Sequence, residues 1–240
     1  MAAGESSGTL ALFAGMPTFS QRNVPLRLRI GLSLFIAVAA QPSLPEMPIT
    51  PLDSLPTLLL LVAQQLLIGL SMGFAVRIVF AALEFAGEII GLQMGLNFAG
   101  FFDPATAQQA TATSSFFSTM VAFLFIAMNG HLLVIEAVVQ SLVAFPVSPE
   151  PFAFLHAVRP EAWGAEIFRL GLWIALPLIA MLLFVNMMLG IIARVAPQIS
   201  IFSVGFPITL GVGLVGVMFT LPLLQGPFTA ALEQMLMMFR

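Results

Sequence analysis

The sequence predicts an all-α integral membrane protein. Of its 240 residues, 60% are hydrophobic and only 8% are charged, and its mean hydropathy is +1.06. A soluble domain is about 45–50% apolar and about 25% charged. Long apolar runs recur along the chain, and a helix pairs its backbone groups within one segment, as a bilayer requires. We therefore expect one membrane domain over residues 1–240, built as a bundle of long, broken helical hairpins.

Two missing residue types exclude several kinds of chemistry. The chain has neither Lys nor Cys, which rules out a P-loop lysine, a Schiff base, a thiol nucleophile and a cysteine-ligated metal. Gly211, Gly213 and Gly216 match a dinucleotide-binding motif, but they lie inside an apolar run rather than between a strand and a helix. The net charge of −3 indicates no nucleic-acid partner. We expect no enzymatic activity, no cofactor and no metal.

The apolar runs divide the chain into spans and connections. The runs predict spans near residues 24–41, 57–76, 116–144, 168–192 and 206–224. Around them we expect a divergent or partial first helix, a Pro-rich linker, a polar loop and a C-terminal tail, at residues 1–21, 41–56, 145–164 and 225–240. The runs are short, glycine-rich and interrupted, so not every run is expected to cross the bilayer.

A turn signal interrupts the third run. Asn129-Gly130 is typical of a turn, and His131 follows it directly. His131 is therefore either a helix-packing histidine beside that turn or a proton relay or pH sensor.

Charge and glycine enter the apolar chain together in residues 77–115. Gly87, Gly91 and Gly95 recur every four residues, and Glu84, Glu88, Gly91 and Gly95 are expected on one face of a helix. A carboxylate at mid-bilayer costs roughly 2.5–3.5 kcal/mol, so both glutamates are expected to face protein or water.

A proline marks the predicted end of this helix. Asp103-Pro104 should terminate it, because proline disfavours a helical residue before it and cannot continue the hydrogen-bond ladder. Residues 105–115 are small and polar. They either need a water-lined or protein-lined place or form an ordinary loop between two spans.

Four stretches, in order along the chain, resemble the FliR family of flagellar type III export-gate subunits, whose injectisome counterparts are similar. The stretches are RNVPLRLRIGL at 22–32, AQQLLIGLSMGFAVRIVFAALEFAGEIIGLQMGLNFAGFFDP at 63–104, MNGHLLVI at 128–135 and ARVAPQISIFSVGFP at 193–207. The similarity covers nearly everything from Arg22 to Leu224. Family members usually carry a fuller apolar first helix, for which only Thr9 to Phe19 stands here.

The resemblance implies a subunit of an export gate in the bacterial inner membrane, within the flagellar basal body. Such proteins form a helical pore complex with FliP- and FliQ-type subunits, next to FlhB- and FlhA-type subunits, and unfolded export substrates pass through it. Surrounding lipid is the other expected partner. An injectisome gate subunit, a small-solute secondary transporter and an intramembrane enzyme are the alternatives.

The resemblance also assigns residues. In the family, the loop after the glycine-rich helix helps to plug the closed pore. That loop corresponds here to residues 98–115, with Phe98, Phe101, Phe102, Asp103 and Pro104 at the constriction, and phenylalanine side chains can form a dewetting seal. The helix before it, with Glu84, Glu88, Gly87, Gly91 and Gly95, is expected to serve either inter-subunit packing or pore lining.

Overall fold

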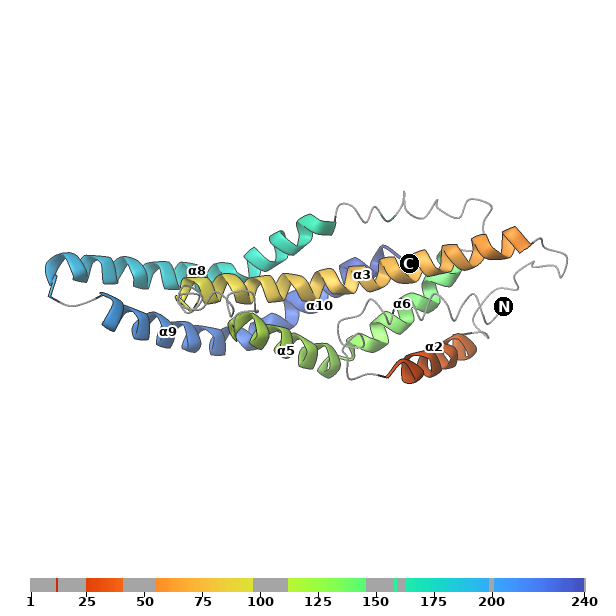
Figure 1. The fold of residues 1–240 in the computed structure, drawn as a ribbon, viewed down its shortest axis with the longest axis horizontal. Helices are drawn as coiled ribbons and strands as arrows, with labels where there is room; N and C mark the ends of the chain where they lie inside the picture. Colours follow the sequence, from red (N-terminus) through yellow and green to blue (C-terminus); the bar gives the residue numbers. More distant parts are fainter. Residues whose placement is uncertain are drawn as a thin grey trace. The chain divides into compact units, whose positions relative to one another are not determined.

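The computed structural model describes Leu12, residues 25–40, 55–96, 112–145, Val158, and residues 163–198 and 201–239. These residues are helical apart from short turns, with no strand among them, which confirms the all-α prediction (Figure 1). The helices are α2 (Leu26–Ala40), α3 (Leu55–Gln93), α5 (Ala112–Ala127), α6 (Gly130–Ala144), α8 (Gly164–Val195), α9 (Ile201–Thr220), the 3-10 helix η3 (Leu221–Leu224) and α10 (Gln225–Met237).

Three segments of the described chain are long and apolar enough to cross a membrane, which confirms the membrane class. They are Val62–Gln93, Gly164–Val195 and Ser203–Met237, and a fourth would be α5 with α6 taken as one bent span. The apolar part of α3 is 61% buried within the chain, whereas that of α8 is only 22% buried. Among these three segments, α3 is therefore the most buried, and α8 presents most of its apolar surface outward.

The predicted span at 57–76 and the predicted glycine-rich helix after it are one continuous helix. α3 runs for 39 residues, because no proline lies between its first turn and Pro104 to break the hydrogen-bond ladder. It begins at Leu55, inside the predicted Pro-rich linker, and it ends at Gln93. The prediction that this helix continues to Asp103-Pro104 is therefore wrong.

The predicted turn at Asn129-Gly130 is present. α5 and α6 meet there at an angle of 67°, and Asn129 adopts the left-handed conformation with φ 56° and ψ 30°. Asn tolerates this conformation better than most residues. A Cβ atom at Gly130 would lie 2.6 Å from the Phe125 ring, so the sharp bend requires a glycine there. His131 is half-buried beside the turn.

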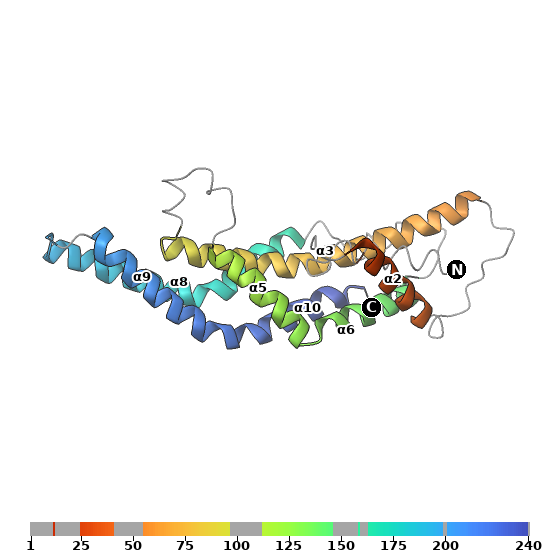
Figure 2. The same ribbon diagram turned by 60° about the horizontal axis from the view of Figure 1, so that its bottom comes forward.

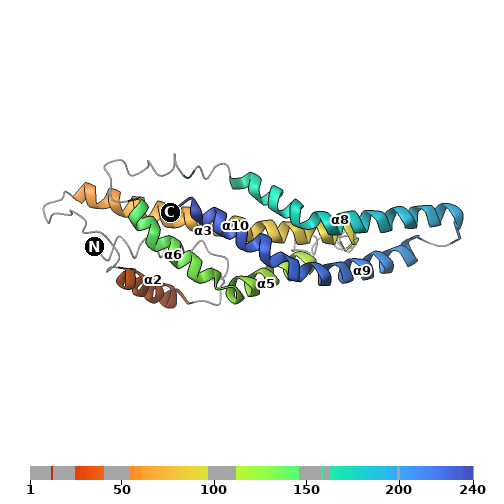
Figure 3. The same cartoon turned by 180° about the vertical axis from the view of Figure 1, so that it is seen from behind.

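The chain separates into two compact units. The first contains residues 1–79, 125–164 and 230–240, and the second contains residues 80–124 and 165–229. Within the first unit, buried Trp163 stacks on Phe74 with ring centroids 6.0 Å apart and meets Phe239 edge-on at 5.9 Å. Phe239 follows α10, the dark blue helix that leads to the mark C in Figure 3. An aromatic cluster thus anchors the C-terminal end of the described chain.

Within the second unit, glycines allow helices to approach closely. A Cβ atom at Gly171 of α8 would lie 2.6 Å from the carbonyl oxygen of Ala82 in α3. Gly216 of α9 leaves room for the Met181 side chain of α8 in the same way, and Figure 2 shows α8 and α9 side by side. Small residues at such contacts are typical of helix association in membranes.

Candidate functional site

Glu84 lies at the contact between α3 and α5. The Ser118 hydroxyl donates a hydrogen bond of 2.6 Å to Glu84 Oε1, and the Ser114 hydroxyl donates one of 3.3 Å to the Glu84 backbone carbonyl. Ser114 and Ser118 are one turn apart and share a face of α5. Glu84 is half-buried, so its carboxylate faces protein and is hydrogen-bonded there. A hydrogen-bonded carboxylate is the form in which a membrane helix accommodates this charge.

Gly87 brings α5 close to α3 one turn further along. A Cβ atom at this position would lie 2.9 Å from Phe117, whose side chain is fully buried. Gly91 is buried as well. Gly87 therefore packs helices within the chain, and Phe117 is the residue that fills the space it leaves.

Gly95 has a different role from the one predicted. It lies beyond the end of α3 with φ 80°, so it does not share a helical face with Glu84 and Gly91. The Leu96 amide donates to the Gly91 carbonyl and the Gly95 amide to the Leu92 carbonyl, both at 3.0 Å. This is the Schellman arrangement, which ends a helix at a left-handed glycine. The helix stops here because Gly95 supplies that conformation.

Glu88 is exposed and makes no hydrogen bond or ion pair with the rest of the described chain. The two carboxylates therefore differ in their surroundings: Glu84 is held by α5, while Glu88 is free to meet water or another protein. An unpaired membrane carboxylate is a candidate functional residue.

The residues at the predicted constriction, Phe98, Phe101, Phe102, Asp103 and Pro104, lie outside the described residues. The predicted loop at 98–115 overlaps α5, which begins at Ala112. Residues 112–115 are therefore helical, and Thr113 and Ser114 are buried.

The hydroxyl partners of Glu84 were not identified from the sequence. Ser118 lies 34 residues from Glu84, so no local pattern joins them. The available signal was the spacing of Ser114 and Ser118, which places two hydroxyls on one helical face. In the described chain, that helix is the next one after the helix that carries Glu84.

The family described as bacterial export proteins, family 1, matches residues 9–235 of the chain. The chain is also similar to the flagellar biosynthetic protein FliR of Escherichia coli (strain K12), with 44% identity over 85% of this chain and 78% of that protein. The chain belongs to the FliR family. The FliR proteins of Pectobacterium carotovorum subsp. carotovorum and Bacillus subtilis (strain 168) are 43% and 32% identical to it. These two alignments cover 91% and 85% of this chain and 83% and 80% of the relatives.

Membership of the FliR family and the apolar helices make the chain a membrane-embedded component of flagellar biosynthesis and protein export. Within this FliR-type chain, the described contacts assign Glu84 and Gly87 to packing between α3 and α5. They leave Glu88 pointing out of the chain.

Proposed function

We propose that the chain is a subunit of the flagellar type III export gate. It forms the entry pore for unfolded flagellar proteins together with FliP- and FliQ-type subunits, next to FlhB- and FlhA-type subunits. The gate lies in the bacterial inner membrane at the flagellar basal body. Flagellar rather than injectisome function is favoured because the curated relatives reported above are flagellar proteins.

The observation that carries this proposal is the outward apolar surface of α8. Large apolar side chains are exposed along its whole length, among them Phe168, Trp173, Phe184, Met187 and Ile192. Between Met187 and Ile192, Gly190 has open space where a Cβ atom would lie. An apolar face with a small residue in it is the surface that a membrane helix offers to a partner helix.

The two carboxylates of α3 support the proposal as well. Glu84 is already used within α3 and α5. Glu88 therefore is the residue that we assign to pore lining or to a contact with a neighbouring subunit, because an exposed carboxylate needs water or a polar partner inside a membrane.

We assign the constriction of the closed pore to the segment that contains Phe98, Phe101, Phe102, Asp103 and Pro104. This assignment rests on the family resemblance. The apolar aromatic rings are suited to exclude water, and a small, polar segment follows them in the sequence.

Co-purification with FliP- and FliQ-type subunits tests the proposal. The tagged chain is co-expressed with these subunits, and the membranes are extracted in mild detergent. The complex should be recovered with the wild-type chain. Gly190→Leu should lower the recovery by about tenfold, since overpacking of a helix contact costs about 1–3 kcal/mol and 1.4 kcal/mol is a factor of ten.

Gly164→Leu is the matched control, because it adds the same side chain to α8 at a second open position, in the first turn of the helix. It should leave recovery within about twofold of wild type, in line with the small effect of most surface substitutions. Failure of the wild-type chain to recover either partner would contradict the proposed assembly. Equal recovery with Gly190→Leu would show that this face of α8 contacts lipid instead.

A further inference from the structure

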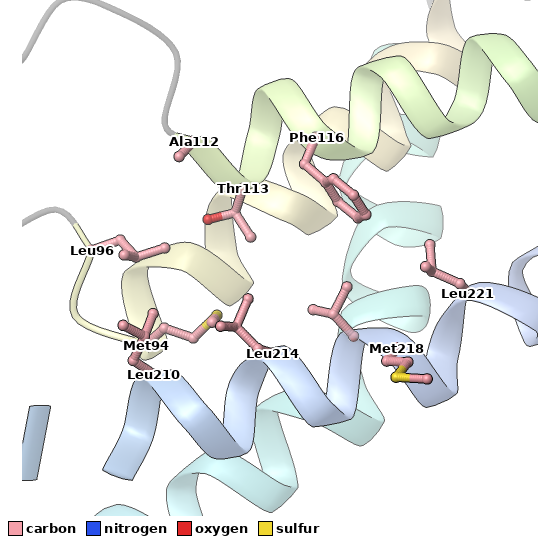
Figure 4. Close-up of a pocket in the computed structure, with 10 residues that line it drawn as sticks. Met94, Leu96, Ala112, Thr113, Phe116, Leu210, Leu214, Met218 and Leu221 are labelled. Carbon is pink, nitrogen blue, oxygen red and sulfur yellow. The ribbon is translucent and has the colours of Figure 1, made fainter. Parts of the chain in front are cut away.

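An apolar pocket of about 480 Å³ lies within the second unit. Its walls come from the end of α3, the start of α5, and α9 with η3 (Figure 4). Phe116 points from α5 into the pocket, and Met94 and Leu214 lie beside each other on the opposite side. Ten residues line the pocket, and Thr113 is the polar one among them. Pockets of about 300–1,000 Å³ with mostly apolar walls and a few polar groups are typical ligand sites.

Thr113 supplies the one hydrogen-bonding group of this wall. Its side chain is only 7% exposed, and its Oγ1 atom is buried without a hydrogen-bond partner among the described residues. A buried hydroxyl without a partner is costly and rare in native structures. The site therefore fits a ligand that brings an acceptor to Thr113.

The mouth of the pocket lies on an apolar surface of α9. Leu214 and Met218 both line the pocket and are 57% and 72% exposed. Their neighbours Val215 and Phe219 do not line it and are exposed to a similar extent, at 55% and 73%. The pocket thus opens on a face that is apolar throughout, in a chain that is embedded in a membrane.

We propose that this pocket holds one acyl chain of a membrane phospholipid, with the Thr113 hydroxyl donating to the ester carbonyl. The lining carries no charge, which disfavours phosphate-bearing or metal ligands inside it. A fatty acyl ester combines a long aliphatic chain with an acceptor at one end, as the pocket requires. Met94 and Met218 have flexible side chains that adapt to irregular apolar shapes. The phosphate headgroup stays outside the pocket.

Photo-crosslinking in native membranes tests the proposal. Phe116→benzoylphenylalanine keeps an aromatic ring at a position that points into the pocket (Figure 4). The full-length chain is irradiated in its host membrane, and the adduct is identified by mass spectrometry. A phospholipid adduct is expected. An adduct with residues 97–111 of the same chain, an adduct with another protein, or the absence of any adduct would overturn the proposal.

Two tryptophan variants separate the pocket from bulk lipid. Leu214→Trp fills the pocket from α9, whereas Val215→Trp adds the same side chain at an equally exposed position outside the lining. Leu214→Trp should reduce the lipid adduct at Phe116 by about tenfold, and Val215→Trp should leave it within about twofold, in line with the difference between overpacked and surface sites. Equal adduct yields in the two variants would mean that the probe samples bulk lipid, which contradicts a specific site.

Thr113→Val tests the hydroxyl separately, because valine keeps the shape of threonine and removes the donor. Release of a radiolabelled phosphatidylethanolamine from the purified chain should become about twofold to tenfold faster, which corresponds to one net hydrogen bond. The photo-adduct should persist, since the aliphatic contacts remain. An unchanged release rate would contradict the role given to the ester carbonyl. All of these experiments measure bound lipid and not secretion. Their outcome therefore tests the lipid site separately from the proposed export function.

Discussion

Gly171→Ala should separate α8 from α3. The new Cβ atom would lie 2.6 Å from the carbonyl oxygen of Ala82 and 2.7 Å from the Phe85 ring. A ring can rotate away, but a backbone carbonyl within α3 moves only with the helix. Overpacking of this kind costs about 1–3 kcal/mol, while alanine itself stabilises a helix by roughly 0.5–1 kcal/mol relative to glycine.

Gly190→Ala in the same helix isolates the packing effect. It adds the same methyl group where no atom lies within 4 Å, so only the gain in helix propensity remains. Because both variants share that gain, the difference between their free energies of unfolding reports the steric effect, expected at about 1–3 kcal/mol. Circular dichroism during denaturant titration of the chain in detergent micelles measures it. Equal free energies of unfolding for the two variants would refute the close contact of Gly171 with Ala82.

Three further changes are expected to have measurable effects. Gly95→Ala should lower the free energy of unfolding by about 1–2 kcal/mol, because φ 80° is strained for any residue with a Cβ atom. Gly95→Asn should lower it less, because asparagine tolerates the left-handed conformation better. Equal effects of the two substitutions would argue against the left-handed helix end. Ser118→Ala should destabilise the chain by about 0.6–1.7 kcal/mol, the range for hydrogen bonds between membrane helices. The same substitution should have no such effect in a chain that already carries Glu84→Leu. A double-mutant cycle that shows no coupling between the two positions would contradict the 2.6 Å hydrogen bond. Phe101→Ala combined with Phe102→Ala should loosen the proposed plug and raise the leak of ions through assembled gates in cells, whereas an unchanged leak would end that assignment.

The sequence predicted those parts of the fold that depend on local signals. The apolar runs predicted membrane helices, because burial of this much apolar surface leaves few other solutions. Asn129-Gly130 predicted the sharp bend, because an asparagine and a glycine together permit a left-handed turn. The predicted spans at 168–192 and 206–224 are likewise two helices, since α8 ends at Val195 and α9 begins at Ile201, although Pro207 lies inside α9.

The end of α3 could not be predicted in the same way. Gly87, Gly91 and Gly95 form one sequence repeat, but Gly87 packs against Phe117 whereas Gly95 ends the helix. A glycine favours both roles, and only the surrounding backbone decides between them. Asp103-Pro104 was the stronger local stop signal, yet the Schellman turn at Gly95 acts first along the chain.

The partners of Glu84 depend on tertiary structure. The contact with Ser118 joins two helices across 34 residues of sequence, and no periodicity within either helix encodes it. The apolar pocket could not be predicted from the sequence for the same reason, because Met94, Phe116 and Leu214 come from three separate parts of the chain. The sequence identified the carboxylate, and the packing of α5 on α3 determined what it contacts.

Secretion in the host is the most direct test of the central claim. The gene is deleted, the deletion is complemented with this sequence, and hook and filament proteins are assayed in the medium and inside the cells. A cytoplasmic protein in the same medium controls for lysis. Loss of both exported proteins from the medium on deletion, with filament protein retained inside the cells and secretion restored by complementation, is the predicted result. Continued secretion of hook and filament proteins without the gene would contradict the export-gate account.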